Sequence, residues 1–372
     1  MQFSDIPGHQ ELKEQLISSY KRGKVAHAQL FAGRQGGAVM PMALAYASYL
    51  MCEQRTSEDS CGVCPNCQRI RKGVHPDLHF IFPKVSASDS SKYDKVLADA
   101  LPKFREFFQS SPFGDLEKWS LAYGQENKNL LIGREDSRYL LKNVSMRSVE
   151  GGYKIILIWC SEMMNASSAN AILKVLEEPP EKTIYLLMTY SYDLLLSTIT
   201  SRSQLIVVPP NTDEEIRKYL VNKGVPDDQA IEAAKLSEGS IGKSVSLTST
   251  ENIQEYKSFQ KWMLDCWKKD LSSLVKNSED FSKSGKAFQK QNLNYSISMV
   301  RNAVRYYGGG ELSVLNEEEQ AFISNFSNKL GYEKLEKVYA LINEAALNLE
   351  RNSNPRITHL NLSLDIIRVI DG

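Results

Sequence analysis

The chain has 372 residues, of which 42% are hydrophobic and 24% are charged, as is typical of a soluble protein with roughly two or three domains. No apolar run approaches the roughly 20 residues that cross a bilayer. No basic stretch followed by an apolar one opens the sequence, so we expect a cytoplasmic protein without a membrane partner. Lys plus Arg equals Asp plus Glu, at 45 each. This balance argues against a protein that grips duplex DNA alone, and we expect any DNA contact to be shared with partners.

The first 210 residues alternate helical and strand patterns. Apolar residues at helical spacing, such as Leu12 and Leu16, predict helices, and the apolar run Ile155–Trp159 is typical of a strand covered on both faces. Strands that alternate with helices predict an α/β domain with a mostly parallel sheet. Strands are expected at 28–32, 78–82, 155–159, 184–189 and 205–208, and helices at 40–51, at 93–108 and along the face of Ala169, Ile172, Leu173 and Leu176 before Pro179–Pro180.

Residues 85–145 interrupt this rhythm, and we interpret them as an insertion or an elaborated crossover whose role the sequence leaves open. Their polar beginning, Ser86–Ser91, is expected to be mobile. After Pro209–Pro210 the strand patterns stop. The predicted domains are an α/β domain over 1–209, a small helical domain over 210–249 with helices at 213–223 and 227–236, and, after a linker or helix start at Thr248–Thr250, a helical domain over 250–372 in which Leu335, Val338, Tyr339 and Ile342 share one face.

Four of the six cysteines lie close together in the sequence, at Cys52, Cys61, Cys64 and Cys67. Two C-x2-C turns that share Cys64 can present thiolates from tight loops, and zinc prefers four such ligands in a tetrahedron. In a cytosolic chain this spacing favours zinc over disulfides. Since four thiolates leave no open coordination position, the predicted zinc is structural.

Two alternatives to this zinc site stay open. The four cysteines could be reduced and without metal. His75 and His79 lie close enough in sequence to be further ligands, although four thiolates already suffice and both residues also fit an ordinary entry into a strand.

A turn rich in glycine follows the first predicted strand, where a phosphate-binding loop would lie. Such a loop needs a Lys for phosphate charge and a Ser or Thr for magnesium. Here Val39 occupies the Lys position, Met40 the Ser/Thr position, and Ala38 replaces the last glycine. The glycines that keep the loop pattern are Gly33, Gly36 and Gly37.

The strand at 155–159 lacks the second part of an ATPase site. An Asp-Glu pair should end this strand if it held magnesium and positioned water, but Trp159 and Cys160 stand there instead. Glu162 is the nearest carboxylate, and we interpret it as a charge at the N-terminus of the following helix. The sequence therefore predicts that the chain hydrolyses no ATP and binds no ATP as a cofactor, although weak nucleotide binding through backbone amides stays open.

Several strings of residues now resemble the AAA+ clamp-loader subunits of bacterial DNA polymerase III. The string Asn170–Pro180 is the most specific of them, and the resemblance is clear over about residues 1–250. In the C-terminal part it depends on a weaker cue, Leu349–Arg356. The other matching features are His27–Gly33, the insertion with four cysteines, His75–Asp77 and Thr200–Ser203.

Within this family the gamma/tau type is the motor and the delta-prime type has a degenerate site. Motor subunits carry an arginine in the helical lid where this chain has Gly242. Together with Val39 and Trp159, this third loss favours the delta-prime type. Thr189, at the end of its strand, stands where the family keeps a polar sensor residue.

The resemblance implies a ring of AAA+ subunits held by C-terminal helical collars, here residues 250–372, with residues 210–249 as the lid. It implies that Arg202, next to Ser201 in the Ser-Arg-Cys motif of the family, reaches the γ-phosphate of ATP on a neighbouring gamma subunit; Ser203 replaces the cysteine. The implied partners are gamma/tau, delta, the sliding clamp and primer-template DNA.

Two other functions stay open. The chain could be an active gamma/tau-like ATPase, against which Val39, Met40 and Trp159 argue. It could also be a zinc-dependent nucleic-acid-binding module, which Arg69, Arg71 and Lys72 beside the cysteines favour slightly, although a solvated basic turn also explains them.

Overall fold

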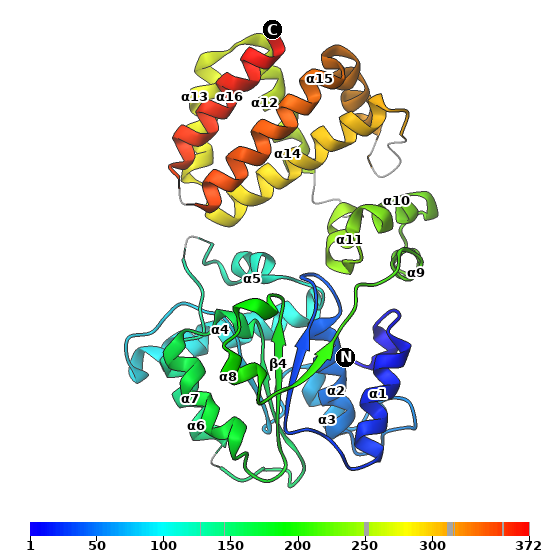
Figure 1. Ribbon diagram of the computed structural model, residues 1–372, viewed down its shortest axis with the longest axis vertical. Helices are drawn as coiled ribbons and strands as arrows, with labels where there is room; N and C mark the ends of the chain where they lie inside the picture. The colour runs from blue at the N-terminus through cyan, green and yellow to red at the C-terminus, as the bar shows by residue number, and fades with distance from the viewer. Residues whose placement is uncertain are drawn as a thin grey trace. The chain divides into compact units, whose positions relative to one another are not determined.

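The computed structural model describes residues 1–372 with the exception of 127, 145, 249–252, 311–314, 316, 352 and 372. Contacts divide the chain into two compact units, Met1–Ser246 and Leu247–Gly372, which are drawn in Figure 1. The predicted lid helices belong to the first unit, so a separate domain over 210–249 stays a prediction. Of the predicted linker, Thr248 ends a helix, and 249–250 lie outside the described residues.

A five-stranded sheet forms the centre of the first unit, with the strand order β2-β3-β4-β1-β5. Every neighbouring pair is parallel, as predicted. All side chains of β3 and β4 are buried, whereas β5 lies at an edge and exposes three of its four residues, which agrees with a parallel sheet that is covered on both faces at its centre. The strands are β1 (Ala28–Ala32), β2 (Leu78–Ile81), β3 (Lys154–Ile158), β4 (Thr183–Thr189) and β5 (Gln204–Val207).

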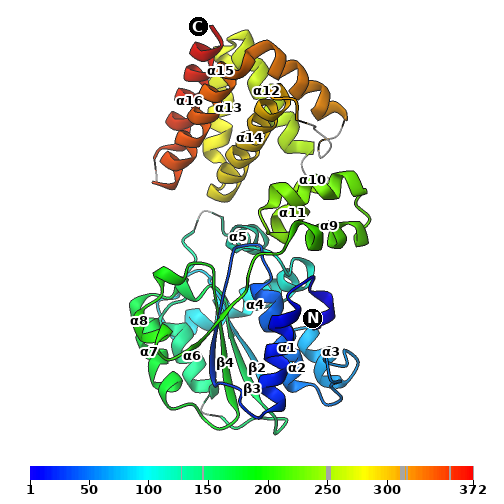
Figure 2. The same cartoon turned by 45° about the vertical axis from the view of Figure 1, so that its right-hand side comes forward.

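Helices cover the two faces of this sheet. Figure 2 shows α1 (Gln10–Lys21) and α2 (Val39–Met51) on one side and α6 (Arg134–Val144) and α7 (Ala166–Glu177) on the other. Every residue of α2 is buried, so this helix forms part of the core. The predicted inner face of α7 is confirmed, because Ala169, Ile172 and Leu176 are at most 2% exposed. Asn165 caps α7 by accepting a hydrogen bond from the Ser168 N–H at 2.8 Å.

The segment after β2 forms α4 (Ser90–Ser110) and α5 (Leu116–Tyr123) before α6. Helix α4 is longer than the predicted helix at 93–108, and the assignment of Ser90 and Ser91 to a mobile polar stretch is wrong. The reason is a cap: the Asp89 carboxylate accepts from the Lys92 N–H at 2.9 Å and starts the helix early.

A buried ion pair fixes this insertion to the sheet. Lys84, just after β2, pairs with Asp136 at the start of α6, and their side chains are 2% and 6% exposed. Asp136 also accepts from the Tyr93 hydroxyl at 3.0 Å and from the Gly133 N–H at 2.8 Å. Because the carboxylate is bonded by three groups, its charge and that of Lys84 are compensated inside the protein.

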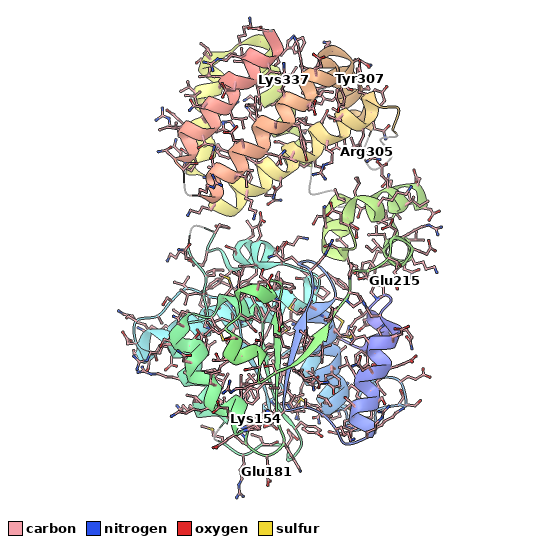
Figure 3. All side chains as sticks on the ribbon, in the orientation of Figure 1. Lys154, Glu181, Glu215, Arg305, Tyr307 and Lys337 are labelled. Atoms are coloured by element: carbon pink, nitrogen blue, oxygen red, sulfur yellow. The ribbon has the colours of Figure 1, made fainter. Side chains whose placement is uncertain are left out.

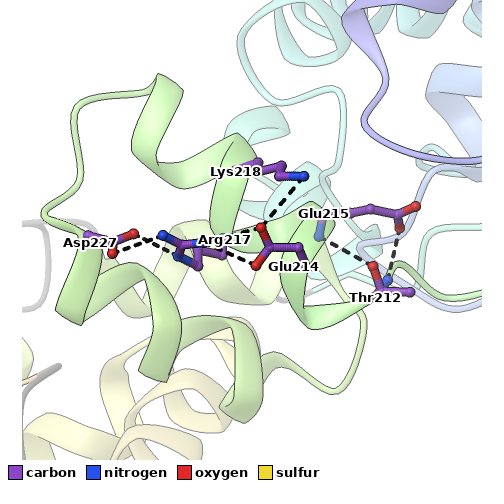
Figure 4. Close-up of polar contacts among 6 residues, drawn as sticks. All are labelled: Thr212, Glu214, Glu215, Arg217, Lys218 and Asp227. Carbon is purple, nitrogen blue, oxygen red and sulfur yellow. Dashed lines mark hydrogen bonds and ion pairs between the residues drawn. The ribbon is translucent and has the colours of Figure 1, made fainter.

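Five short helices complete the described part of the first unit: α3 precedes β2, α8 precedes β5, and the other three follow the sheet. Figure 4 shows how Arg217 connects two of them: its Nε lies 2.7 Å from Asp227, and its Nη1 3.1 Å from Glu214. The two helices predicted after the last strand are thus confirmed. The bounds are α3 (Pro65–Arg71), α8 (Ser197–Thr200), α9 (Asp213–Asn222), α10 (Asp227–Ser237) and α11 (Ile241–Thr248).

The second unit consists of helices, as predicted. Its core includes Leu335, Val338 and Ile342, all completely buried, with Tyr339 packed beside them. In the described part of the chain no helix is long and apolar enough to cross a membrane. The helices are α12 (Ile253–Lys268), α13 (Leu271–Lys283), α14 (Lys286–Tyr307), α15 (Glu317–Glu350), which bends at Gly331, and α16 (Pro355–Asp371).

His359 is a polar group within this helical core. Its ring lies 4.9 Å from that of Trp262 and 4.5 Å from that of Phe281, and its Nδ1 is 3.0 Å from the Ser278 hydroxyl. Burial lowers the pKa of His359 to about 4. The neutral ring is therefore the form that the folded core accepts.

This pKa predicts an acid sensitivity of the second unit. The folded state binds the proton less readily than the unfolded chain, so stability is complete above the unfolded pKa and falls as the pH drops from about 6.5 toward 4, by at most about 1.4 kcal/mol per pH unit. In His359→Phe this part of the pH dependence should be absent. Urea unfolding of the two proteins between pH 4 and pH 7 measures the difference, and parallel curves would contradict the prediction.

Candidate functional site

The four clustered cysteines come together in space, as predicted. Cys52 follows α2, Cys61 lies in a loop, Cys64 caps α3 and Cys67 stands in its first turn. Their sulfur atoms lie within 4.8 Å of one another, with 4.0 Å both from Cys52 to Cys64 and from Cys61 to Cys67. Tetrahedral zinc with Zn–S bonds of about 2.3 Å would place sulfurs about 3.8 Å apart, so the four residues fit a metal ion of this kind.

Backbone N–H groups point at three of these sulfurs. The Cys61 N–H donates to the Cys52 Sγ at 3.3 Å, the Cys64 N–H to the Cys61 Sγ at 3.3 Å, and the Cys67 N–H to the Cys64 Sγ at 3.5 Å. The Cys64 N–H lowers the pKa of the Cys61 thiol to about 6, whereas burial raises the pKa of Cys52 and Cys67. The buried thiols would therefore lose their protons only to a cation that replaces them.

The two nearby histidines are not part of this group. Among the described residues that could hold a metal together here, the cluster comprises the four cysteines alone. His75 uses its Nδ1 to accept the Asp77 N–H at 3.1 Å.

The loop of the cysteine cluster holds the N-terminal segment. The Asp59 carboxylate accepts the N–H groups of Phe3 at 3.0 Å and Ser4 at 2.9 Å, and the Gln2 side chain donates to the Ser60 carbonyl at 2.5 Å. A short 3-10 helix, η1 (Phe3–Asp5), lies there with Phe3 buried. A metal in the cluster would stabilise this packing and would have no position open for a substrate.

The loop after β1 keeps the shape of a tight turn, but the side chain of Val39 covers it. Gly36 has φ +70°, a left-handed conformation suited to glycine. A Cβ placed on Gly33 would lie only 2.7 Å from a methyl group of Val39, so Val39 folds over the loop. Val39 and Met40 are 0% and 2% exposed. The two positions that would carry a phosphate-binding cation and a metal-binding hydroxyl thus belong to the core.

The lid closes directly on this loop. The Gly242 N–H donates to the Gly36 carbonyl at 2.8 Å, and the Ser240 hydroxyl to the Gln35 carbonyl at 3.2 Å. A Cβ placed on Gly242 would overlap the Phe113 carbonyl oxygen and lie 3.1 Å from the Gly36 Cα. The carbonyls of Gln35 and Gly36 therefore accept hydrogen bonds from the lid. In a nucleotide site, a loop at this place would instead direct its N–H groups at phosphate.

The end of β3 is occupied by aromatic packing. Trp159 is 1% exposed, its ring lies 5.7 Å from that of Phe107 in α4, and its Nε1 donates to the Tyr190 hydroxyl at 2.9 Å. The interpretation of Glu162 as an N-terminal charge of α7 is wrong, because it lies in the short helix η2 (Ser161–Met163) and accepts the Tyr190 N–H at 3.1 Å.

Arg202 lies at the surface between α8 and β5. Its Nε and Nη2 both lie 2.6 Å from one carboxylate oxygen of Glu177, the last residue of α7. Its Nη1 donates to the Thr198 carbonyl at 3.0 Å and to the Ser201 hydroxyl at 3.3 Å. The sequence indicated Arg202 and Ser201 but gave no sign of Glu177 as a partner, because the two charges stand 25 positions apart.

Comparison with known proteins places these features in a family. A family model described as DNA polymerase III, delta subunit, matches residues 8–212. The chain belongs to this family. The DNA polymerase III subunit delta' of Escherichia coli (strain K12) is 27% identical over 65% of this chain, and that of Bacillus subtilis (strain 168) is 26% identical over 64%. The resemblance that the sequence motifs indicate is thereby confirmed.

A relative with another subunit name also matches. DNA polymerase III subunit tau/gamma of Haemophilus influenzae is 29% identical over 66% of this chain. The alignments span 60% and 59% of the length of the two delta' relatives and 30% of the tau/gamma relative.

Metal content tests the cysteine cluster. We expect the purified chain to hold one zinc ion and Cys64→Ser to lose it, with a fall in the free energy of unfolding of several kcal/mol, because metal binding to such a site contributes directly to folding. Elemental analysis and thermal unfolding measure both effects. Cys266→Ser, which changes a buried cysteine of the second unit, should keep its zinc; equal zinc content in all three proteins would refute the assignment.

Substitution of Gly242 tests the contact between loop and lid. Gly242→Ala should lower the free energy of unfolding by about 1–3 kcal/mol, the usual range for overpacking, because the added methyl group meets backbone atoms of Phe113 and Gly36. Gly152→Ala is the matched control, since no atom lies within 4 Å of a Cβ at that position. Urea unfolding compares the two variants, and equal stabilities would show that the lid does not rest on the loop.

Proposed function

We propose that this chain is a non-catalytic clamp-loader subunit of DNA polymerase III, of the delta' type. It acts with gamma/tau and delta subunits to load the sliding clamp on primer-template DNA. The observation that carries this proposal is the combination of the family match over residues 8–212 with a loop after β1 that Val39 covers and the lid contacts. A cytoplasmic location follows from that role.

The chain contributes no ATP hydrolysis of its own in this proposal. Support comes from Val39, which covers the loop, and from the Gly242 N–H, which donates to the Gly36 carbonyl at 2.8 Å. Trp159 supports it further, because an indole in an aromatic cluster cannot hold magnesium or activate water. No nucleotide is therefore bound as a cofactor by this subunit.

Arg202 supplies positive charge in trans. Phosphoryl transfer moves negative charge onto the γ-phosphate and the leaving oxygen, and a fixed guanidinium beside them lowers the barrier. Arg202 lies at the surface between α8 and β5, its side chain is 35% exposed, and the Ser201 hydroxyl accepts one of its N–H groups. In the assembled ring we assign it to the ATP site of an adjacent gamma subunit, with the second unit as the collar that joins the subunits.

The cysteine cluster holds a structural zinc ion in this proposal. Bound there, zinc would keep Cys52, Cys61, Cys64 and Cys67 as thiolates and hold the loop that anchors the N-terminal segment. A role in nucleic-acid binding is less well supported, because Arg69 of α3 is already paired with Glu150 at 2.6 Å.

An active gamma/tau-like ATPase is the second candidate, since the tau/gamma relative matches as much of the chain as the delta' relatives do. ATP turnover by the isolated chain would favour it. Because Val39 covers the loop after β1, we expect the isolated chain to show no ATP turnover.

Reconstitution with gamma and delta subunits tests the proposed role of Arg202. Arg202→Ala should assemble but lose the turnover of the site that it serves, by about 10³-fold or more at that site. Clamp-stimulated ATPase of the complex measures the loss. Arg138→Ala, an exposed arginine on α6 that is also paired, should behave like the wild type, and so would Arg202→Ala if the proposal were wrong.

A further inference from the structure

In this chain most N–H donors of the Arg202 guanidinium already have an acceptor. Arginine has five N–H donors in a fixed fork. Here Nε and Nη2 are directed at Glu177, and Nη1 makes two bonds, to Thr198 and Ser201. Among the described contacts one N–H donor of Arg202 is left without an acceptor. The side chain therefore cannot offer a phosphate the two parallel N–H groups of a bidentate contact without releasing a partner.

The partner to be released is Glu177. Its carboxylate is the only full negative charge among the groups that the structure gives to Arg202 in its described contacts, and it stands in the last turn of α7. The carbonyls at a helix C-terminus carry partial negative charge, so a glutamate there is stabilised by a nearby cation. An incoming γ-phosphate would meet this carboxylate as a like charge. The Glu177 carboxylate and the γ-phosphate therefore cannot both make their full set of hydrogen bonds to Arg202.

We propose that Glu177 is a positioning residue that holds Arg202 in an ion pair until the phosphate of a neighbouring ATP displaces the Glu177 carboxylate. This ion-paired arrangement of Arg202 is called the parked state below. This inference rests on the proposed function, because it requires that Arg202 acts at a neighbour's site. When ATP binds to the neighbouring subunit, the Arg202–Glu177 ion pair opens. The guanidinium then exchanges a carboxylate partner for a phosphate partner.

The exposure of the pair suits such an exchange. The side chains of Arg202 and Glu177 are 35% and 47% exposed, so water screens their attraction and the pair is weak enough to open. The buried pair of Lys84 and Asp136, at 2% and 6% exposure, shows the opposite design, in which separation would leave uncompensated charges in the core.

The first experiment tests the parked state in the isolated chain. Phenylglyoxal modifies free guanidinium groups, and mass spectrometry of the peptide that contains Arg202 gives its rate. Glu177→Ala should raise this rate about two- to five-fold, the factor that corresponds to the loss of an exposed ion pair. Glu178→Ala is the matched control, since the adjacent glutamate is exposed and makes no described contact with Arg202. Equal rates in the three proteins would overturn the proposal.

The second experiment tests the exchange in the complex with gamma and delta subunits. Glu177→Ala should lower the ATP concentration for half-maximal turnover by up to about five-fold and leave the maximal rate unchanged, because the parked competitor is gone. In the Arg202→Ala background the same substitution should have no effect. A lower maximal rate, or an equal effect in both backgrounds, would overturn the proposal and make Glu177 a purely structural residue.

The two hypotheses fail in different ways. If Arg202→Ala turns over like the wild type, the trans-acting arginine is wrong, and the parked state with it. If Arg202→Ala loses turnover while Glu177→Ala equals Glu178→Ala in both experiments, the arginine acts in trans and only the parked state is wrong.

Discussion

A single backbone hydrogen bond, from the Gly242 N–H to the Gly36 carbonyl, brings the lid into contact with the phosphate loop. It requires two residues without side chains, because a Cβ on Gly36 would overlap the Ser240 hydroxyl and one on Gly242 the Phe113 carbonyl. Other contacts build on it: the Arg34 guanidinium donates to the Glu238 carbonyl at 3.1 Å. Within the lid, Glu215, labelled in Figures 3 and 4, accepts the Thr212 N–H at 2.9 Å and thereby caps the start of α9.

The residue after β3 and the insertion are structurally connected. Trp159 follows β3, and its ring packs against Phe104 and Phe107 of α4 at 5.5 and 5.7 Å. The insertion then continues to Phe113, whose ring lies 5.5 Å from that of Tyr219 in the lid. A residue that cannot ligate magnesium thus provides the apolar contact on which an extra layer of helices rests.

The sequence predicted the features that depend on local pattern. The parallel sheet, the inner face of α7, the cysteine cluster and the altered loop each follow from residues close together in the chain. It did not predict the pairs of Lys84 with Asp136 and Arg202 with Glu177, which join charges 52 and 25 positions apart. The position of Glu162 was misjudged for the same reason: its partner, the Tyr190 N–H, follows β4 and stands 28 positions away. Local periodicity carries no information on which distant segments meet.

The link between Asp59 and the N–H groups of Phe3 and Ser4 has a consequence for the order of folding. Phe3 and Ser4 cannot make these bonds until their partner, which lies about 55 positions later, is in place. That partner is in turn shaped by a loop that needs Cys67 to be complete. If a metal ion completes the cysteine loop, its binding would therefore also govern when Phe3 and Ser4 can pack against that loop.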